Sequence, residues 1–538
     1  MKSLKSRIIV ALVAVAILAG ILATAQSFLS PDSTAKWTSL IPALFAIGLA
    51  FATHRVQLSL GVAILVGAFI AGPLTKVPQQ FFHDLTSPVM DMTNLKILSF
   101  MVLLIPGLNI VLKAGGIQEL LLNFAAWASE RRSTQLATVI LGLLIFVDDY
   151  ANTWMVGSTM QDPSERSGVS RAKLSFLVDA TSAPVAGLAF VSTWIGYELG
   201  LFQKILTDLQ IDMDPYSLFL EALPYRFYCV LMLIFVFIVA ISGRDFGPML
   251  KEEINTYKNR LTNMAPIETK KLSLRSLAAI ISLGTLFVSI FAGFMWQGDF
   301  VSLWGNGLRG TELLRTLLSS VDSIVILAWS SVAFFIVSVL STLVLGRRPI
   351  DKIGKDFISG IRSAMVPLTI LVLSWGLKSN LTALNASQFL SDTFAQNLTP
   401  AFFPMTVFLL ASVTAFCTGT SWGTMAILIP TLIPLAHALD GGQLGLISII
   451  SCAAILDGAI FGDHCSPISD TTIMSATASD CDLILHARTQ MPYALFVALF
   501  AAFLAYVPAA MGLSAWIALP GATLLMALVF WKISTKVA

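Results

Sequence analysis

Residues 462–472 read GDHCSPISDTT and follow directly on the apolar run LGLISIISCAAILDGAIF at 444–461. The polar stretch brings two carboxylates, a histidine, a cysteine, two serines and two threonines to the end of a segment that would otherwise cross a membrane. Polar groups in hydrocarbon are costly unless protein surrounds them or they line an ion path. A proline beside small residues also interrupts a helix. The pattern therefore predicts a spanning helix that unwinds here to form a site.

Composition defines the surroundings of this stretch. Of the 538 residues, 56% are hydrophobic and 12% are charged, and the mean hydropathy is +0.82. A soluble globular protein carries about 25% charged residues, so that class is excluded. Apolar windows long enough to cross a bilayer recur along the chain, and we expect roughly a dozen spanning helices in the cell (inner) membrane.

The cysteines and the N-terminus add two smaller inferences. The five cysteines lie in or beside apolar segments without a CxxC pair, so neither a disulfide framework nor a zinc site is indicated. Residues 1–27 combine a basic start, an apolar core and ATA before Gln26, as a cleaved signal peptide would. We favour an uncleaved first spanning helix, because the chain is polytopic.

The bias of Lys and Arg toward the cytoplasm gives the expected orientation, with both termini cytoplasmic. The apolar stretch at about 134–160 has basic residues on both flanks, namely Arg131, Arg132, Arg166, Arg171 and Lys173. A segment that crossed once would put one flank outside, so we expect a re-entrant hairpin open to the cytoplasm. Two arms of about 13 residues rise about 20 Å each, which puts DDYANT (148–153) near the middle of the membrane.

The same plan occurs a second time in the opposite orientation. We expect an N-terminal half at 1–243 with this hairpin and a broken helix at 172–199, a cytoplasmic linker at 244–275, and a C-terminal half at 276–538 with a re-entrant hairpin at about 399–439 and a broken helix at 444–478. The letters match weakly, ANTWMVG (151–157) with GTSWGTM (419–425) and TSAPVAG (181–187) with HCSPISD (464–470). The expected fold class is an all-α polytopic membrane protein with inverted structural repeats, an architecture typical of secondary transporters.

Four stretches also resemble a known family. They are FVDDYANTWMVGSTM, SRAKLSFLVDATSAPVA, TGTSWGTMAILIP and GAIFGDHCSPISDTTIMSA. They are similar to the NhaC-type sodium/proton antiporter family of the ion-transporter superfamily, and the similarity runs from about residue 95 to residue 510. The resemblance implies a secondary transporter that exchanges Na+ for H+, although some relatives carry organic anions or amino acids. It implies no ion-ligand set, so the candidate residues rest on chemistry.

Sodium is a hard cation that prefers oxygen ligands, which carboxylates, hydroxyls, amides and the carbonyls freed at helix breaks supply. A carboxylate kept partly dry binds either H+ or Na+ but not both well, and exchange follows from that competition. The first-half candidates are Asp148, Asp149, Asn152, Thr153, Asp179, Thr181 and Ser182. The second-half candidates are Thr418, Thr420, Ser421, Asp457, Asp463, Ser466, Ser469, Asp470, Thr471 and Thr472. The strongest candidates for transported Na+ fall at a tip or a break, namely Asp149, Asp179, Asp463 and Asp470.

Several of these side chains also have purely structural interpretations. Asp148 or Asp149 can cap a helix, because two adjacent carboxylates do not ionise together cheaply. Asp457 can be a structural hydrogen-bonding group as readily as a ligand. His464 can carry protons, but we favour a buried neutral imidazole bonded to a serine.

Other residues are expected to have structural roles first. Trp154 and Trp422 can stack on an organic cargo, but core packing is the default expectation. The basic residues Arg166, Arg171 and Lys173 are interpreted as orientation charges. The stretch CDLILHARTQ (481–490) is predicted to be a solvated inner loop.

Three classes of function remain open from the sequence. Na+/H+ exchange is the leading one, and a Na+- or H+-coupled carrier of a small organic anion or amino acid is the alternative. A channel needs no pair of broken helices and is disfavoured. An enzyme is not expected, because the chain has no HExxH motif, no P-loop and no soluble domain. We expect no cofactor beyond the transported Na+ and H+, lipids and a possible homodimer as partners, and no nucleic acid.

Overall fold

The computed structural model describes residues 37–537 except 126–127, 129, 259–272, 311–312, 314–315, 318–319 and 395–398. Nine helices in this part are long and apolar enough to cross a membrane, or ten if the bent pair Pro215–Tyr225 and Phe227–Ser242 counts as one span. The prediction of a polytopic, all-helical membrane protein is confirmed. The interpretation of residues 1–27 as an uncleaved helix lies outside the described residues.

The N-terminal elements are η1 (Trp37–Leu40), α2 (Ile41–Thr53), α3 (Val56–Ala71), η2 (Leu74–Lys76), α4 (Val77–Met90), α5 (Met92–Lys113), α6 (Gly116–Ala125), α7 (Arg131–Leu144), α8 (Asp149–Ser167), α9 (Arg171–Ala180), α10 (Ala183–Ala186), α11 (Thr193–Asp208), α12 (Pro215–Ala222), η3 (Leu223–Tyr225), α13 (Phe227–Ser242), β1 (Arg244–Asp245) and α14 (Gly247–Lys258).

The C-terminal elements are α15 (Leu274–Gln297), α16 (Phe300–Gly305), α18 (Ser323–Val344), α19 (Ile350–Ala383), α20 (Ala386–Phe394), η4 (Pro400–Phe402), α21 (Phe403–Thr418), α22 (Ser421–Leu439), α23 (Leu446–Cys465), α24 (Asp470–Ala478), α25 (Leu483–Phe500), η5 (Ala501–Tyr506), α26 (Val507–Ala510), α27 (Ala515–Ile533) and β2 (Thr535–Lys536).

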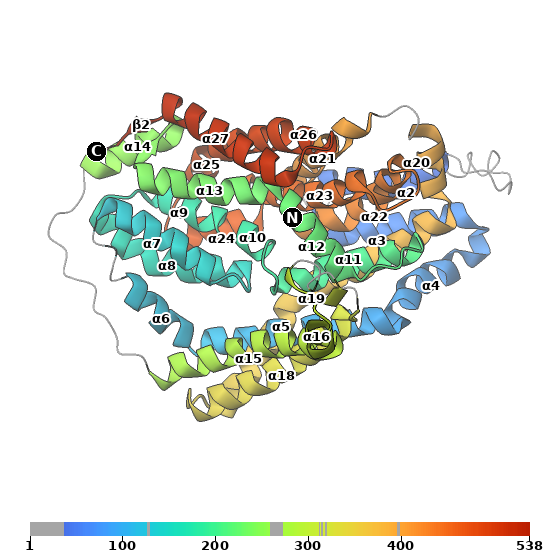
Figure 1. The fold of residues 1–538 in the computed structure, drawn as a ribbon, viewed down its shortest axis with the longest axis horizontal. Coiled ribbons are helices and arrows are strands. Elements are labelled where there is room, and N and C mark those ends of the chain that lie inside the picture. The colour runs from blue at the N-terminus through green and yellow to red at the C-terminus, as the bar shows by residue number, and fades with distance from the viewer. Residues whose placement is uncertain are drawn as a thin grey trace, which may run out of the picture.

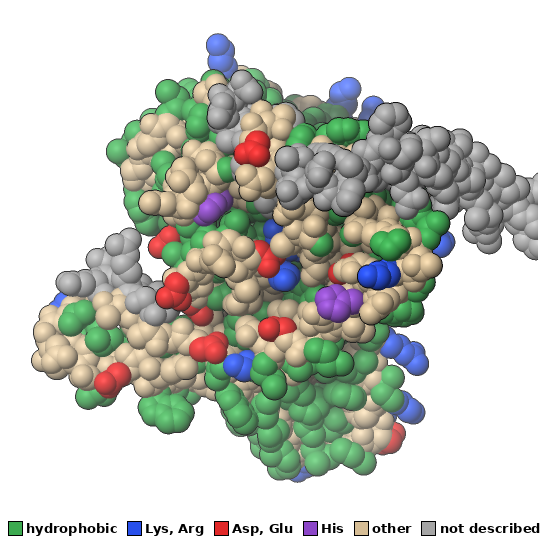
Figure 2. Space-filling model, turned by 90° about the vertical axis from the view of Figure 1, so that its right-hand side faces the viewer, with side chains coloured by type: hydrophobic (Ala, Val, Ile, Leu, Met, Phe, Trp, Pro, Cys, Tyr) green, Lys and Arg blue, Asp and Glu red, His purple; other side chains and the backbone are tan. Residues whose placement is uncertain are grey.

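Two groups of helices face each other across the molecule. Helices α5, α15 and α18 pack together along one edge, and the long helix α19 packs on α5 (Figure 1). The hairpin helices and α23 to α27 form the other group, together with α13. On the end of the molecule seen in Figure 2, acidic, basic and histidine side chains cross the middle of the view, and a hydrophobic area lies below them. This arrangement leaves an apolar outer surface for lipid, as a bilayer requires.

The first hairpin consists of α7 and α8, which pack on each other. Its tip covers residues 145–148, and Asp148 begins α8 by accepting a hydrogen bond from the backbone N–H of Ala151 at 2.8 Å. The second arm runs to Ser167, so the arms have 14 and 19 residues instead of about 13 each. Pro163 does not end α8, since the helix continues through it to the left-handed Gly168.

The second hairpin consists of α21 and α22, joined by a two-residue tip. Gly419 ends α21 with φ of 70°, a conformation that glycine adopts without strain. A Cβ atom on this glycine would stand 2.8 Å from the carbonyl oxygen of Ile468. The glycine therefore lets the second tip lie directly against the break between α23 and α24.

One predicted loop is wrong. The stretch 481–490, expected to be solvated, begins α25 at Leu483 and buries His486 and Gln490. His486 and Gln490 face polar groups inside the protein, whereas Asp482 and Arg488 are exposed, and hydropathy does not distinguish the two environments.

The described part of the expected linker is ordered against the membrane helices. Strand β1 pairs with β2 near the C-terminus in antiparallel register, with Arg244 opposite Lys536. Glu253 of α14 accepts a hydrogen bond from the backbone N–H of Ser170 at 2.7 Å and pairs with Arg131. Lys173 is completely buried and pairs with Asp245, so it is a structural ion-pair partner and not only an orientation charge.

Candidate functional site

The first hairpin tip is fastened to the first helix break. The side-chain amide of Asn152 donates to the carbonyl oxygens of Gly142 at 2.6 Å, Ile145 at 3.1 Å and Thr181 at 2.9 Å. A Cβ atom on Gly142 would lie 2.1 Å from the hydroxyl of Thr181. Carbonyl groups at helix ends have no intrahelical donor, and Asn152 supplies one to each of these three. The bond to the Thr181 carbonyl holds the tip against the first break.

The second hairpin tip is fastened to the second break through a carboxylate. Asp463 Oδ2 accepts hydrogen bonds from the backbone N–H of Ser421 at 3.2 Å and from its hydroxyl at 2.6 Å. The Ser469 hydroxyl donates to the other oxygen, Oδ1. Ser466 donates to the carbonyl of Phe416 at 2.7 Å, so the break also holds the end of α21.

The two halves meet at the tip of the first hairpin. The phenol of Tyr150 donates to Asp470 Oδ2 at 2.5 Å, and α8 packs along α24. Thr193 at the start of α11 donates its hydroxyl to Asp148 Oδ2 at 3.1 Å. Nearby, the rings of Trp194 and Trp422 lie 4.9 Å apart between centroids. The structure therefore places the first tip in contact with Asp470 of the second break and with the start of α11.

Asp149 differs from its neighbours because its carboxylate accepts no hydrogen bond of good geometry from the described residues. Its side chain is completely buried, and neither carboxylate oxygen has a hydrogen-bond partner among the described residues. The indole N–H of Trp194 is a neighbouring donor, but it stands outside hydrogen-bond geometry. Asp148, Asp470 and Asp463 are close enough to repel a charge on Asp149.

Asn152 and Thr153 extend this unsatisfied group along α8. The amide oxygen of Asn152 and the hydroxyl of Thr153 are also buried without a partner among the described residues. Residues 149, 152 and 153 are three and four positions apart, so they share one face of the first helical turn. Carboxylate, amide and hydroxyl oxygens on one face are the ligand types that a hard monovalent cation requires.

Asp179 belongs to a separate network that the sequence did not reveal. Its Oδ2 atom lies 3.1 Å from His486 Nε2 and accepts a hydrogen bond from Gln490 at 2.9 Å, while Oδ1 has no partner among the described residues. Gln490 also donates to the carbonyl of His464, and His464 Nε2 lies 2.5 Å from the Tyr228 hydroxyl. The expected serine partner of His464 is wrong, because this imidazole bonds to a tyrosine and a glutamine.

Four carboxylates at the tips and breaks have no basic counter-charge among the described residues, and a fifth, Asp179, pairs with His486 at 3.1 Å. Among the described residues, no Lys or Arg forms an ion pair with Asp148, Asp149, Asp179, Asp463 or Asp470. Asp457 provides the contrast, since Arg226 donates to it at 2.7 Å and the Tyr506 hydroxyl at 2.8 Å. Asp457 is therefore a structural ion-pair residue, whereas a charge on the completely buried Asp149 has neither a cationic partner nor a hydrogen bond among the described residues to offset it.

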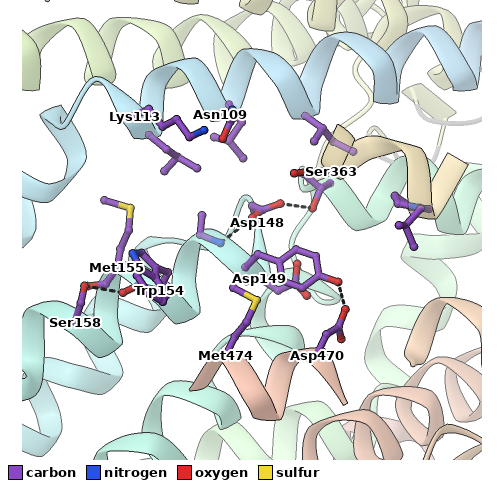
Figure 3. A pocket seen from close by; sticks show the side chains of 18 of the residues that line it. Asn109, Lys113, Asp148, Asp149, Trp154, Met155, Ser158, Ser363, Asp470 and Met474 are labelled. Atoms are coloured by element: carbon purple, nitrogen blue, oxygen red, sulfur yellow. Dashed lines mark hydrogen bonds between the residues drawn. The ribbon is translucent and has the colours of Figure 1, made fainter. Parts of the chain in front are cut away.

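A cavity of about 700 Å³ lies beside the first tip. Figure 3 shows Asn109 and Lys113 of α5 on one side and Asp149, Trp154, Asp470 and Met474 on the other. Trp154 is 52% exposed and lines this cavity, so the expectation that it packs in the core is wrong. Trp422 is 5% exposed and packs against Tyr197, with ring centroids 4.6 Å apart, as that expectation requires.

Most of the remaining hydroxyl candidates are occupied locally. Thr181 and Ser182 donate to the carbonyls of Leu177 and Asp179, and Thr418 donates to that of Thr414. The Thr471 hydroxyl lies 2.9 Å from Ser469, and Thr472 donates to the Asp463 carbonyl at 3.2 Å. Thr420 stands at the start of α22 without a side-chain cap bond.

Two other chemistries do not fit the site. Among the described residues no three His, Cys, Asp or Glu side chains converge as a metal cage, so any Na+ site must draw on hydroxyl, amide and carbonyl oxygens as well. The letters GTSWG at 419–423 match the GxSxG pattern of hydrolases. The Ser421 hydroxyl donates to Asp463 and to the carbonyl of Ala459, so it has no histidine base.

Broken helices that hold a buried polar site within a polytopic bundle define a secondary transporter. The chain belongs to the Na+/H+ antiporter family, whose model matches residues 185–509. An uncharacterized protein of Haemophilus influenzae is 30% identical over 482 residues, which covers 87% of this chain and 89% of that protein. The chain is therefore a multi-pass membrane transporter of the Na+/H+ antiporter type, and the family implies Na+ and H+ as transported ions.

Shorter matches reach relatives with organic cargo. The malate-2H+/Na+-lactate antiporter of Bacillus subtilis is 34% identical over 92 residues, 17% of this chain and 19% of that protein. The arginine/ornithine antiporter ArcD of Halobacterium salinarum is 31% identical over 149 residues, 27% of this chain and 28% of that protein. In structure, the YdaH transporter of Alcanivorax borkumensis covers 92% of this chain and 99% of its own with a TM-score of 0.54 at 14% identity, which supports the fold alone.

Proposed function

We propose that the protein exchanges Na+ for H+ at the tip of the first hairpin, with Asp149 as the carboxylate that binds either ion. The observation that carries this proposal is the complete burial of Asp149 with two unpartnered oxygens and no Lys or Arg counter-ion among the described residues. A buried carboxylate in that state is stable only when a proton or a metal cation neutralises it. Since one proton and one Na+ compete for the same oxygens, each ion displaces the other.

The ligand set that we propose for Na+ follows from the unpartnered oxygens. Asp149, Asn152 and Thr153 supply carboxylate, amide and hydroxyl oxygens from one face of α8. Asp470 stands across the interface between the halves and is joined to Tyr150. Asp463 and Asp179 keep secondary roles in this proposal, because donors from Ser421, Ser469 and Gln490 already occupy their oxygens in part.

We further propose that the two halves, 1–243 and 276–538, are inverted repeats joined by the linker at 244–275. Both termini are cytoplasmic in this arrangement, as the Lys and Arg distribution predicts. The tips and breaks move as one unit past a scaffold that includes α3 and α18, and a homodimer forms through that scaffold. Support comes from the two hairpins, each fastened to the break in its own half by the bonds of Asn152 and of Ser421.

A second candidate function is the coupled transport of a small organic anion or amino acid. The cavity volume of about 700 Å³ favours it. A water molecule takes about 30 Å³ of liquid, so a lone Na+ with its ligands would fill little of this space. Pockets that hold organic ligands enclose about 300–1,000 Å³. The relatives that exchange malate, lactate, arginine or ornithine lend this candidate support.

Flux measurements in liposomes test the proposal. The purified chain is reconstituted with an internal pH dye, and Na+, Li+ or K+ is added outside without organic solute. Na+-driven alkalinisation of the lumen is the expected result, and it should vanish in Asp149→Asn. Asp162→Asn is the matched control, since Asp162 lies exposed on the same helix. Proton movement that requires an organic solute would instead favour the second candidate function.

A further inference from the structure

The cavity beside the first hairpin has two walls of opposite charge. Asp148, Asp149 and Asp470 line one wall, on α8 and α24. Lys113 on α5 stands on the facing wall together with Asn109 (Figure 3). Lys113 is the one Lys or Arg among the described residues that line this cavity. A ligand that fills the space therefore meets acceptors at one end and a cationic donor at the other.

Both ends retain unused hydrogen-bonding capacity. The Lys113 ammonium donates to the Ser359 hydroxyl at 2.8 Å, which leaves two of its three N–H groups for a ligand. Asp149, at the other end, is completely buried with two oxygens that have no partner among the described residues. Lys113 is exposed, whereas Asp149 is completely buried. The free donors and the free acceptors therefore lie on different walls of the cavity.

Three classes of small ligand can be compared with these walls. A bare metal cation would use the acidic wall but would leave Lys113 as a repelling charge. An organic anion without an amine would face three carboxylates against one lysine. An aminocarboxylate satisfies both walls, because its ammonium pairs with the buried carboxylates and its carboxylate accepts charge-assisted hydrogen bonds from Lys113. Trp154, Met155 and Met474 line the space between and offer apolar contact to its carbon skeleton.

We propose that this cavity binds a small zwitterionic aminocarboxylate, with its ammonium at Asp149 and Asp470 and its carboxylate at Lys113. The inference rests on the second candidate function, that the cavity holds an organic cargo. It narrows that cargo from organic anions and amino acids to solutes that carry both charges. Lys113 becomes the residue that selects for the carboxylate.

Titration calorimetry on the purified full-length chain in detergent tests this proposal with matched ligands. The probes are the proteinogenic amino acids and a series that removes one charged group at a time, namely L-leucine, 3-methylbutylamine and 4-methylpentanoate. We expect at least one aminocarboxylate to bind more tightly than its decarboxylated amine and its deaminated acid. Lys113→Gln should weaken that binding about tenfold or more, the value of one charge-assisted contact.

Two control variants distinguish a loss of carboxylate recognition by Lys113 from misfolding of the chain. Lys76→Gln removes an exposed lysine of η2 and should leave aminocarboxylate binding unchanged. Lys113→Arg keeps the positive charge and should restore most of the binding lost in Lys113→Gln, while the amine-only probe should bind Lys113→Gln no more weakly than wild type. A Lys113→Gln chain that binds the aminocarboxylate normally would overturn the proposal, as would equal binding of the amine by wild type.

The outcome is distinguishable from that of the Na+/H+ proposal. If no aminocarboxylate binds the wild-type chain while Na+ alone drives protons across liposomes, this inference is wrong and Na+/H+ exchange stands. If an aminocarboxylate binds with the predicted dependence on Lys113 while Na+ moves no protons, the inference stands and the Na+/H+ proposal is wrong.

Discussion

The two hairpin tips share a layout but differ in how their oxygens are satisfied. At the second tip Asp463 accepts bonds from the backbone and hydroxyl of Ser421 and from Ser469, so both carboxylate oxygens are occupied. At the first tip both oxygens of Asp149 are unpartnered among the described residues. The first tip also lines the large cavity, to which the second contributes only Trp422.

The difference in hydrogen bonding predicts different roles for the two hairpin tips. A carboxylate saturated by protein donors gains little from a cation, whereas a buried and unsatisfied one must take a proton or a metal ion. At the second tip, the bonds of Asp463 join α22 to the break after α23. In the function proposed above, the first tip provides the exchange site, and the Tyr150–Asp470 bond couples it to the segment that follows α23.

The largest effect is expected at the unsatisfied carboxylate. Asp149→Asn removes the charge that binds Na+ while it keeps the shape of the side chain. Loss of a charged contact of about 3 kcal/mol corresponds to about a 100-fold weaker apparent Na+ affinity. Na+-dependent proton flux in liposomes measures it, with Asp162→Asn as the control on the same helix. Normal Na+-dependent proton flux in Asp149→Asn would contradict the assignment of ion binding to the first tip.

Asp463 should respond as a structural residue. Asp463→Ala leaves the backbone N–H of Ser421 without its acceptor, which costs about 1–3 kcal/mol in the free energy of unfolding, while the Ser421 hydroxyl keeps the carbonyl of Ala459. Asp463→Asn retains an accepting oxygen, so its apparent Na+ affinity should fall by less than about tenfold, the value of a single charged bond of about 1.4 kcal/mol. Thermal unfolding in detergent and flux measure the two quantities. A loss in Asp463→Asn as large as that in Asp149→Asn would show that both tips bind the ion.

The bridge between the halves should have an intermediate effect. Tyr150→Phe removes the 2.5 Å bond to Asp470 without changing the ring. A hydrogen bond to a charged group contributes about 1.5 kcal/mol, so we expect the apparent Na+ affinity to fall about tenfold. Tyr225→Phe serves as the control on another ring and should have no effect. If Tyr150→Phe transports as wild type does, the two halves are not coupled through this contact.

The smallest effect on Na+ binding is expected at a threonine of the first tip, and a threonine at the second tip serves as its matched control. Thr153 has a buried hydroxyl without a partner among the described residues, whereas Thr418 at the second tip donates to the carbonyl of Thr414 at 2.8 Å. Thr153→Val should weaken Na+ binding about fivefold, for a ligand contact of about 1 kcal/mol. Thr418→Val should stay within about twofold, since it removes only a local bond. Equal effects at the two positions would contradict the assignment of the exchange site to the first tip.

Sequence reasoning located the tips and breaks because their chemistry is local. The basic flanks of 134–160 and the proline at Pro467 mark interruptions that hydropathy and charge bias detect without knowledge of packing. The family and the all-helical membrane fold followed from the same stretches. Asp149, Asn152 and Thr153 could be named because they supply carboxylate, amide and hydroxyl oxygens within the predicted tip DDYANT.

The rest of the site depends on contacts between distant segments. Nothing local to Asp463 indicates that Ser421, 42 positions away, occupies its oxygen. Gln490 and His486 were assigned to a loop, because a short polar run flanked by apolar residues looks the same whether it faces water or a buried carboxylate. Lys113 ends an ordinary spanning helix, and only the placement of α5 opposite α8 brings it to the cavity.

Proton release on Na+ binding tests the central claim most directly. Na+ is titrated into the purified chain at one pH in two buffers of different ionisation enthalpy, and the difference in heat gives the number of protons released per Na+ bound. Competition at Asp149 predicts close to one proton released by wild type, and neither Na+ binding nor release in Asp149→Asn. Na+ binding that releases no proton, or an unchanged release from Asp149→Asn, would contradict the account.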